Sequence, residues 1–145
     1  GNVLTRLEKL DSGEYGALIL AEAGLKRLGL SDRIAYRFSP EELVPAAGQG
    51  ILAIQTRAGE YADLLARLNS PDGALCAKTE RQLASLLGGD CSAPVGCHAQ
   101  LHGTDMTLYG FSGIGGVPRY GSVQGNRNDA DLLVQQLASK LTITE

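Results

Sequence analysis

The residue best placed for chemistry is Cys91, which follows a Gly-Gly pair between an expected helix and an expected strand. Glycines adopt backbone conformations that other residues resist, and functional side chains concentrate on loops carried by rigid elements. The sequence therefore predicts a thiol at a loop tip. Such a thiol acts as a nucleophile, or is alkylated, when its thiolate is accessible. A half-exposed loop cysteine without a role is the alternative.

The other cysteines and the two histidines have a simpler interpretation. Cys76 lies on the apolar stripe of an expected helix and Cys97 in an expected strand, where free cysteine behaves as a small hydrophobe. His98 and His102 share one face of that strand, because side chains alternate with period two, and we expect that face to meet solvent. Together with Cys91 these residues lack the paired spacing of structural zinc sites, so we expect no metal.

Composition bounds the class of protein. The 145 residues are 43% hydrophobic and 20% charged, which is ordinary for a globular chain. The net charge of -3 argues against bulk attraction to nucleic acid. No apolar run approaches the roughly 18 residues that span a bilayer. Three widely spaced cysteines make no disulfide framework. We therefore expect a cytoplasmic protein without nucleic-acid or membrane partners.

The first half is typical of part of an α/β domain. Short apolar runs predict strands at residues 15–21, 34–38 and 51–55, the first of them buried in a parallel sheet. Helical spacing predicts helices at residues 3–10, 24–28 and 60–68, the last of them amphipathic. These elements do not amount to a complete sheet.

The second half predicts helix, three strands, helix. Ser70 is a helix cap with Pro71 at the first helical position, and that helix ends at Gly88. The expected strands are residues 95–101, 106–112 and 119–124. Asn128 should cap a last helix, whose apolar face holds Ala130, Leu133, Val134, Leu137 and Leu141. The expected architecture is a three-stranded antiparallel sheet with helices on one face.

Four short motifs occur in a fixed order along the chain. They are GNVLTRL at residues 1–7, AEAGLKRLG at 21–29, PAAGQG at 45–50 and GGDCSAPVG at 88–96. Each alone is modestly specific, but in this order they make the chain resemble the porphobilinogen deaminase family, also called hydroxymethylbilane synthase. The family enzyme has three domains and is considerably longer, so the chain resembles its C-terminal half.

This resemblance implies a domain organisation of class α/β plus α+β. Residues 1–43 correspond to the remainder of the second domain, an α/β domain like that of periplasmic binding proteins. Residues 44–70 correspond to a hinge, followed by a crossover strand and helix that belong to the first domain. Residues 71–145 correspond to the C-terminal α+β domain, which carries the cofactor cysteine.

The resemblance also implies a cofactor site. Cys91 matches the residue that forms a thioether to a dipyrromethane, the primer on which a chain of pyrroles grows. Arg6 and Arg27 match arginines that contact the acetate and propionate groups of the pyrroles, which suits a guanidinium because it binds carboxylates with two parallel hydrogen bonds. Lys26 and Arg33 have no such motif support.

Three further positions are implied by their motifs alone. Ala21 should offer backbone groups to the cofactor, and Gln49 and Gly50 should border the cofactor cleft at the crossover between the large domains. A hinge turn is the plainer interpretation of PAAGQG. The family's catalytic aspartate has no counterpart here, so no residue is assigned a catalytic role.

The implied reaction is that of a transferase in tetrapyrrole biosynthesis, which joins four porphobilinogen molecules into hydroxymethylbilane with loss of ammonia. The implied partners are porphobilinogen, the growing oligopyrrole and the N-terminal half of the same protein. The isolated chain should be inactive and is a candidate for self-association, because an incomplete α/β half exposes apolar surface. Two alternatives remain open: a small-molecule binding module, and a non-catalytic interaction domain built on residues 71–145.

Overall fold

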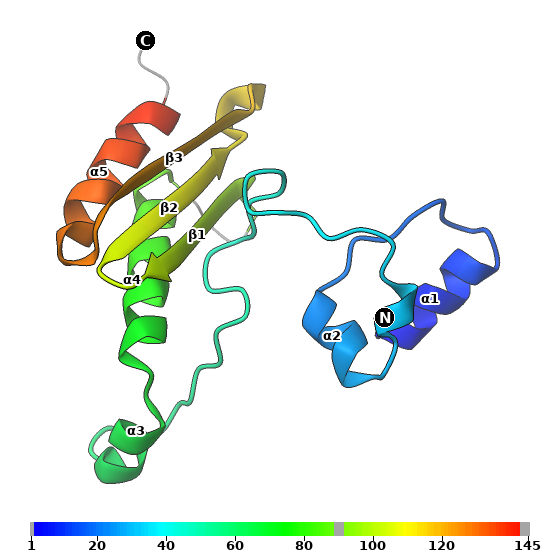
Figure 1. The fold of residues 1–145 in the computed structure, drawn as a ribbon, viewed down its shortest axis with the longest axis horizontal. Helices are drawn as coiled ribbons and strands as arrows, with labels where there is room; N and C mark the ends of the chain where they lie inside the picture. The colour runs from blue at the N-terminus through cyan, green and yellow to red at the C-terminus, as the bar shows by residue number, and fades with distance from the viewer. Residues whose placement is uncertain (1, 89–91, 143–145) are drawn as a thin grey trace. The chain divides into compact units, whose positions relative to one another are not determined.

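The computed structural model describes residues 2–88 and 92–142. The chain divides into two compact units, Gly1–Phe38 and Ser39–Glu145, each considered by itself (Figure 1). Across the described residues, no helix combines the length and the apolar character needed to cross a membrane.

The first unit is built from two short helices. Helix α1 (Val3–Asp11) begins at Asn2, whose side-chain oxygen accepts a hydrogen bond of 2.9 Å from the amide of Thr5. Helix α2 (Glu22–Arg27) is followed by a 3-10 turn, η1 (Ser31–Arg33). Leu7 on α1 and Leu25 on α2 are the buried apolar side chains among the described residues of this unit. The helices predicted at residues 3–10 and 24–28 are confirmed.

The strands predicted in the first half are wrong. Residues 15–21, 34–38 and 51–55 carry no β-structure, and their apolar side chains are largely exposed. Ile19 is 68% exposed and Leu52 is 93% exposed. A strand forms only when a neighbouring strand takes up its backbone hydrogen bonds, and no described residue pairs with these runs. An apolar run alone therefore did not decide the conformation.

The C-terminal unit contains a three-stranded antiparallel sheet in the order β1-β2-β3, as predicted. The strands are β1 (Val95–His102), β2 (Asp105–Ser112) and β3 (Arg119–Asn126). The register places Cys97 opposite Gly110 and Leu108 opposite Val123. No strand among the described residues pairs with the outer side of β1, which makes β1 an edge strand of this sheet.

Two helices cover one face of this sheet (Figure 1). Helix α4 (Pro71–Leu86) begins at Ser70, whose hydroxyl oxygen accepts a hydrogen bond of 3.1 Å from the amide of Gly73, which confirms the predicted cap. Helix α5 (Ala130–Leu141) presents the predicted apolar face. The buried core comprises Leu83, Leu87, Cys97, Ala99, Met106, Leu108, Val123, Ala130, Leu133, Val134, Leu137, Ala138 and Leu141.

Two helix starts differ from their predictions. Asn128 does not cap α5. A 3-10 turn, η3 (Arg127–Asp129), precedes the helix instead, and the side chain of Asn126 accepts a hydrogen bond from the amide of Asn128. The helix predicted at residues 60–68 is the shorter α3 (Ala62–Leu68), which follows Tyr61 in a left-handed conformation with φ of 58° and buries no side chain.

Candidate functional site

Cys91 lies outside the described residues, so its predicted place on a loop tip stays a prediction. The elements on either side of it in the sequence are described. Helix α4 ends at Leu86, Gly88 takes a φ of 72°, and strand β1 begins at Val95. Cys91 therefore belongs to the connection between two elements of the same packed core.

The two cysteines that the structure describes are poor nucleophiles. Cys97 is fully buried, and burial followed by the nearby charge of Glu80 raises the pKa of its thiol to about 12. Cys76 is partly buried against the core, and burial is the largest cause that raises the pKa of its thiol. Both behave as the small hydrophobes that the sequence predicted, since only a thiolate attacks an electrophile readily.

Arg6 and Arg27 differ from the other cations of the first unit. Both are exposed, and within the described chain neither has a carboxylate partner. The remaining cations of the unit are all paired, as Lys9–Glu14, Lys26–Glu22, Arg33–Asp11 and Arg37–Glu22. Among the described residues of this unit, the two arginines that the motifs single out are thus the two cations without a carboxylate partner.

Ala21 is exposed and precedes helix α2 with an extended backbone. Its carbonyl oxygen accepts a hydrogen bond of 3.0 Å from the amide of Gly24, so this oxygen is already engaged at the start of the helix. The predicted contact between its backbone and a cofactor stays a prediction.

Gln49 and Gly50 lie in a tight turn and are exposed. The amide of Gln49 donates to the carbonyl of Ala46 at 3.3 Å, and the amide of Ile51 donates to the carbonyl of Gly48 at 3.2 Å. Gly48 and Gly50 both have a φ near 80°, which favours glycine. The turn projects the Gln49 side chain from a backbone that is fixed by hydrogen bonds.

Glu80 is the residue that sequence reasoning missed. It lies on α4, is only 2% exposed, and accepts hydrogen bonds from the amides of Ala99 at 2.9 Å and Gly48 at 2.7 Å. Burial by itself raises the pKa of this carboxyl, but hydrogen bonds from His98 and from the two amides outweigh it and lower the pKa. An acid inside the apolar stripe of Cys76, Leu83 and Leu87 was the signal that could have found it.

The interpretation of the histidines needs a correction. His98 does not simply face solvent: its side chain is 25% exposed, its Nδ1 lies 3.3 Å from an oxygen of Glu80, and its ring stacks on Tyr109. His102 is exposed, as expected. The reason is that β1 is an edge strand, so a side chain of its outer face can reach round the edge to a carboxylate on α4. In the part of the chain that the structure describes, no three metal-ligating side chains gather.

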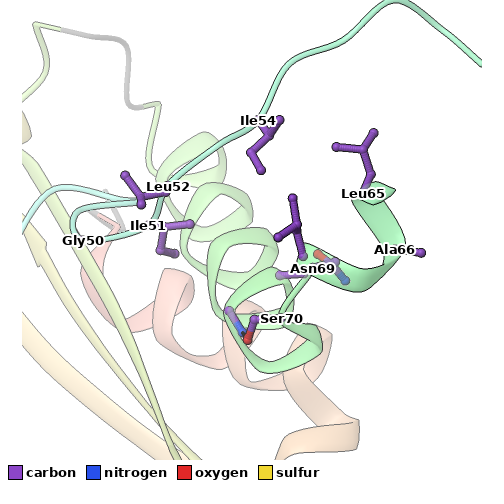
Figure 2. Close-up of a pocket in the computed structure, with 11 residues that line it drawn as sticks. Gly50, Ile51, Leu52, Ile54, Leu65, Ala66, Asn69 and Ser70 are labelled. Carbon is purple, nitrogen blue, oxygen red and sulfur yellow. Dashed lines mark hydrogen bonds between the residues drawn. The ribbon is translucent and has the colours of Figure 1, made fainter. Parts of the chain in front are cut away.

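An open groove of about 700 Å³ lies within the C-terminal unit (Figure 2). An extended segment forms one wall, while α3 and the start of α4 form the other, and Ile54 and Leu65 face each other across it. It is lined by Gly50, Ile51, Leu52, Ile54, Leu65, Ala66, Leu68, Asn69, Ser70, Gly73 and Ala74. The lining carries no charged side chain, so it suits an apolar occupant rather than a polycarboxylate.

Comparison with known families decides the relationship. Residues 1–64 match a sequence model described as "Porphobilinogen deaminase, dipyromethane cofactor binding domain", and residues 74–142 match one described as "Porphobilinogen deaminase, C-terminal domain". The chain belongs to the porphobilinogen deaminase family.

Curated members of the porphobilinogen deaminase family show how much of it the chain represents. The chain is 48% identical to the porphobilinogen deaminase of Chromobacterium violaceum, covering 97% of this chain and 47% of that protein. It is 46% identical to that of Thiobacillus denitrificans, with the same coverage, and 43% identical to that of Ruminiclostridium josui, covering 49% of that protein. The chain spans about half the length of these relatives and matches their C-terminal part.

The two family matches divide the predicted site. The match to the cofactor-binding domain contains every predicted residue up to Gly50, whereas Cys91 falls within the match to the C-terminal domain. The resemblance inferred from four motifs is confirmed. Neither a solute-binding module nor a non-catalytic interaction domain is favoured by these matches.

Proposed function

We propose that this chain is part of a transferase that joins four porphobilinogen molecules into hydroxymethylbilane, with release of ammonia, on a dipyrromethane primer attached to Cys91. The observation that carries the proposal is the paired family match, in which a cofactor-binding domain is followed by the domain that contains the GGDCSAPVG motif. The enzyme belongs to tetrapyrrole biosynthesis, and the expected compartment is the cytoplasm.

Cys91 is the residue we propose as the tether. Of the three cysteines, Cys97 is sealed in the core and Cys76 is partly buried with a raised pKa, which leaves Cys91 for covalent chemistry. A thiolate is a soft nucleophile that attacks an electrophilic carbon readily. The thioether that forms resists both hydrolysis and reduction. When bound, the primer supplies the pyrrole carbon to which the next unit is joined.

Arg6 and Arg27 are the residues we propose to hold carboxylates. Every pyrrole unit carries acetate and propionate groups, so the growing chain accumulates negative charge. Two exposed guanidinium groups without carboxylate partners in the described chain fit such a ligand. Ala21, Gln49 and Gly50 are proposed to border the cofactor through their backbone and side-chain amides.

The rest of the polypeptide is the partner that we propose for the exposed apolar segments. Residues 1–43 would complete an α/β domain like that of periplasmic binding proteins, and residues 44–70 would contribute a strand and a helix to a further domain. The exposed Ile19, Leu52 and Ile54 support this, because buried strands are rich in such residues. Residues 71–145 form the C-terminal domain. Self-association is the fate expected for the isolated chain.

The test compares the isolated chain with the complete polypeptide. Because the resemblance assigns the family's catalytic aspartate to the half of the protein that this chain does not match, we expect the purified 145-residue protein to give no steady turnover of porphobilinogen. In the complete polypeptide, Cys91→Ser should abolish product formation, while Cys76→Ser, the matched control, should retain it. Full activity of the Cys91→Ser variant, or steady turnover by the isolated chain, would refute the proposal.

A further inference from the structure

Residues 44–48, which include most of the PAAGQG motif, are hydrogen-bonded to the sheet and helix of the C-terminal unit. The amide of Cys97 donates a hydrogen bond of 2.8 Å to the carbonyl of Pro45, and the amide of Gly48 donates one of 2.7 Å to Glu80. A little earlier in the chain, the side chain of Glu41 hydrogen-bonds to the hydroxyl of Tyr109 on β2. The segment therefore has contacts with a strand edge and a helix, and the chain just before it reaches the outer face of the sheet.

Its place is the free edge of β1. An edge strand leaves every second amide without a strand partner, and a buried amide without a partner is costly. On β1 the amides of Cys97 and Ala99 are two of these, and the first donates to Pro45 and the second to Glu80. The segment and the carboxylate thus take up two adjacent outward amides in the middle of the edge.

Gly96 permits this close approach. A Cβ atom at this position would lie 2.6 Å from the carbonyl oxygen of Val44 and 3.0 Å from its Cβ. Since the nearest atom belongs to backbone, no side-chain rotation could relieve the contact. The contact between Val44 and strand β1 therefore requires glycine at position 96.

Glu80 joins the turn, strand β1 and helix α4. Its Oε1 accepts from Ala99 on β1 and its Oε2 from Gly48 in the turn, while its backbone belongs to α4. Helix α4 runs directly into the connection that contains Cys91. A carboxylate has the acceptor capacity for two amides and an imidazole together, which an amide side chain lacks.

We propose that Glu80 is a positioning residue, which holds the turn of residues 46–50 on helix α4 and thereby fixes Gln49 and Gly50 relative to the helix that leads to Cys91. The importance of this position for cofactor binding rests on the proposed function. The set of hydrogen bonds from Ala99 and Gly48 to Glu80, here called the clamp, does not rest on the proposed function, because these contacts lie wholly within the C-terminal unit.

The titratable groups around Glu80 are few. His98 and Cys97 face it from β1, and Cys76 lies one turn earlier on α4. Residues 44–48 carry no titratable side chain. Protonation of Glu80 removes part of its acceptor capacity, so protection of the Gly48 amide should fall as the pH drops below the ordinary carboxyl pKa of 4.5.

The test is residue-resolved amide hydrogen exchange on the 145-residue chain, comparing Glu80→Gln with the unsubstituted protein. Glutamine keeps the size of the side chain but replaces one acceptor with a donor. We expect the Gly48 amide to exchange at least about tenfold faster, which corresponds to one lost hydrogen bond of about 1.4 kcal/mol. The amides of Leu108 and Val134 should change less than about threefold. Asp72→Asn, a carboxylate on the same helix, is the matched control and should leave Gly48 unchanged.

Two further variants sharpen the result. Gly96→Ala should free the same segment from the strand side and speed exchange at Gly48 without touching Glu80. The pH dependence of Gly48 protection between pH 3 and 5 should be present in the unsubstituted protein and absent in Glu80→Gln. If Gly48 is equally protected in Glu80→Gln, or if all amides of the unit lose protection together, Glu80 is not a positioning residue.

The same sample separates this inference from the proposed function. Loss of Gly48 protection in Glu80→Gln supports the clamp whether or not any pyrrole is attached to the protein. Absence of a pyrrole adduct from the active complete polypeptide would refute the tether and leave the clamp standing. The two proposals therefore fail by different observations.

Discussion

The two units of this chain hold their secondary structure in different ways. In the Ser39–Glu145 unit a sheet and two helices bury one continuous core, whereas in the Gly1–Phe38 unit two short helices bury little beyond Leu7 and Leu25. The first unit carries the unpaired arginines, and the second carries the segment leading to Cys91. A packed core next to the proposed tether and an exposed pair of arginines are therefore built from separate parts of one chain.

The largest expected effect is on the core of the C-terminal unit. Leu137 is fully buried, so Leu137→Ala should destabilise this unit by about 2–5 kcal/mol, through lost burial and the cavity that remains. Thermal unfolding followed by circular dichroism measures the change. Leu7→Ala is the matched truncation in the first unit and should leave the unfolding of the sheet unaltered. Equal effects of both on the sheet would show that the two units unfold as one.

The second prediction concerns the unpaired cations. Arg6→Gln or Arg27→Gln in the complete polypeptide should raise the KM for porphobilinogen at least about tenfold, since a hydrogen bond to a charged group is worth roughly 1.5–3 kcal/mol. Arg33→Gln is the control, because Arg33 is already paired with Asp11. If all three variants behave alike, the distinction between paired and unpaired cations has no functional meaning.

The third prediction uses pH to probe the clamp. The folded pKa of Glu80 is lowered, so its contribution to stability is present above pH 4.5 and is lost as the pH falls through the folded value. As the pH falls from 6 to 3.5, the free energy of unfolding of the C-terminal unit should decline in both proteins. The decline should be larger by roughly 1–3 kcal/mol in the unsubstituted protein than in Glu80→Gln. Urea unfolding at pH 6 and pH 3.5 provides both values. Parallel declines would contradict the role of this carboxylate.

The smallest expected effect lies on the surface of the first unit. Lys9 and Glu14 form an ion pair whose side chains are 42% and 50% exposed. Glu14→Gln should change stability by no more than about 0.5 kcal/mol, because solvent and salt screen such pairs. A larger loss in urea unfolding would show that the first unit depends on its surface charges more than on Leu7 and Leu25.

Sequence patterns predicted the C-terminal unit well because its partners lie close together in the chain. The face formed by Leu133, Leu137 and Leu141 has the helical period, and the three strands follow one another through short turns. Those local signals agree with the core that forms. Asn128 failed as a cap because the neighbouring Asn126 took that role for a 3-10 turn.

The first half was predicted less well for a physical reason. The runs at residues 15–21 and 51–55 have strand-like composition, but pairing requires a partner that composition does not supply. In the candidate site, too, the sequence did not reveal which residues would have partners. Motifs located Arg6 and Arg27, but only the ion pairs of their neighbours show that these two are unpaired. Glu80 was missed because a carboxylate is rarely buried, and only its hydrogen bonds explain it.

Peptide mass mapping of the active complete polypeptide tests the central claim most directly. We expect a dipyrromethane mass on the peptide that contains Cys91, with unmodified Cys76 and Cys97, and no such mass in the Cys91→Ser variant. An active enzyme in which Cys91 is a free thiol, or in which the pyrrole mass maps to another residue, would contradict it.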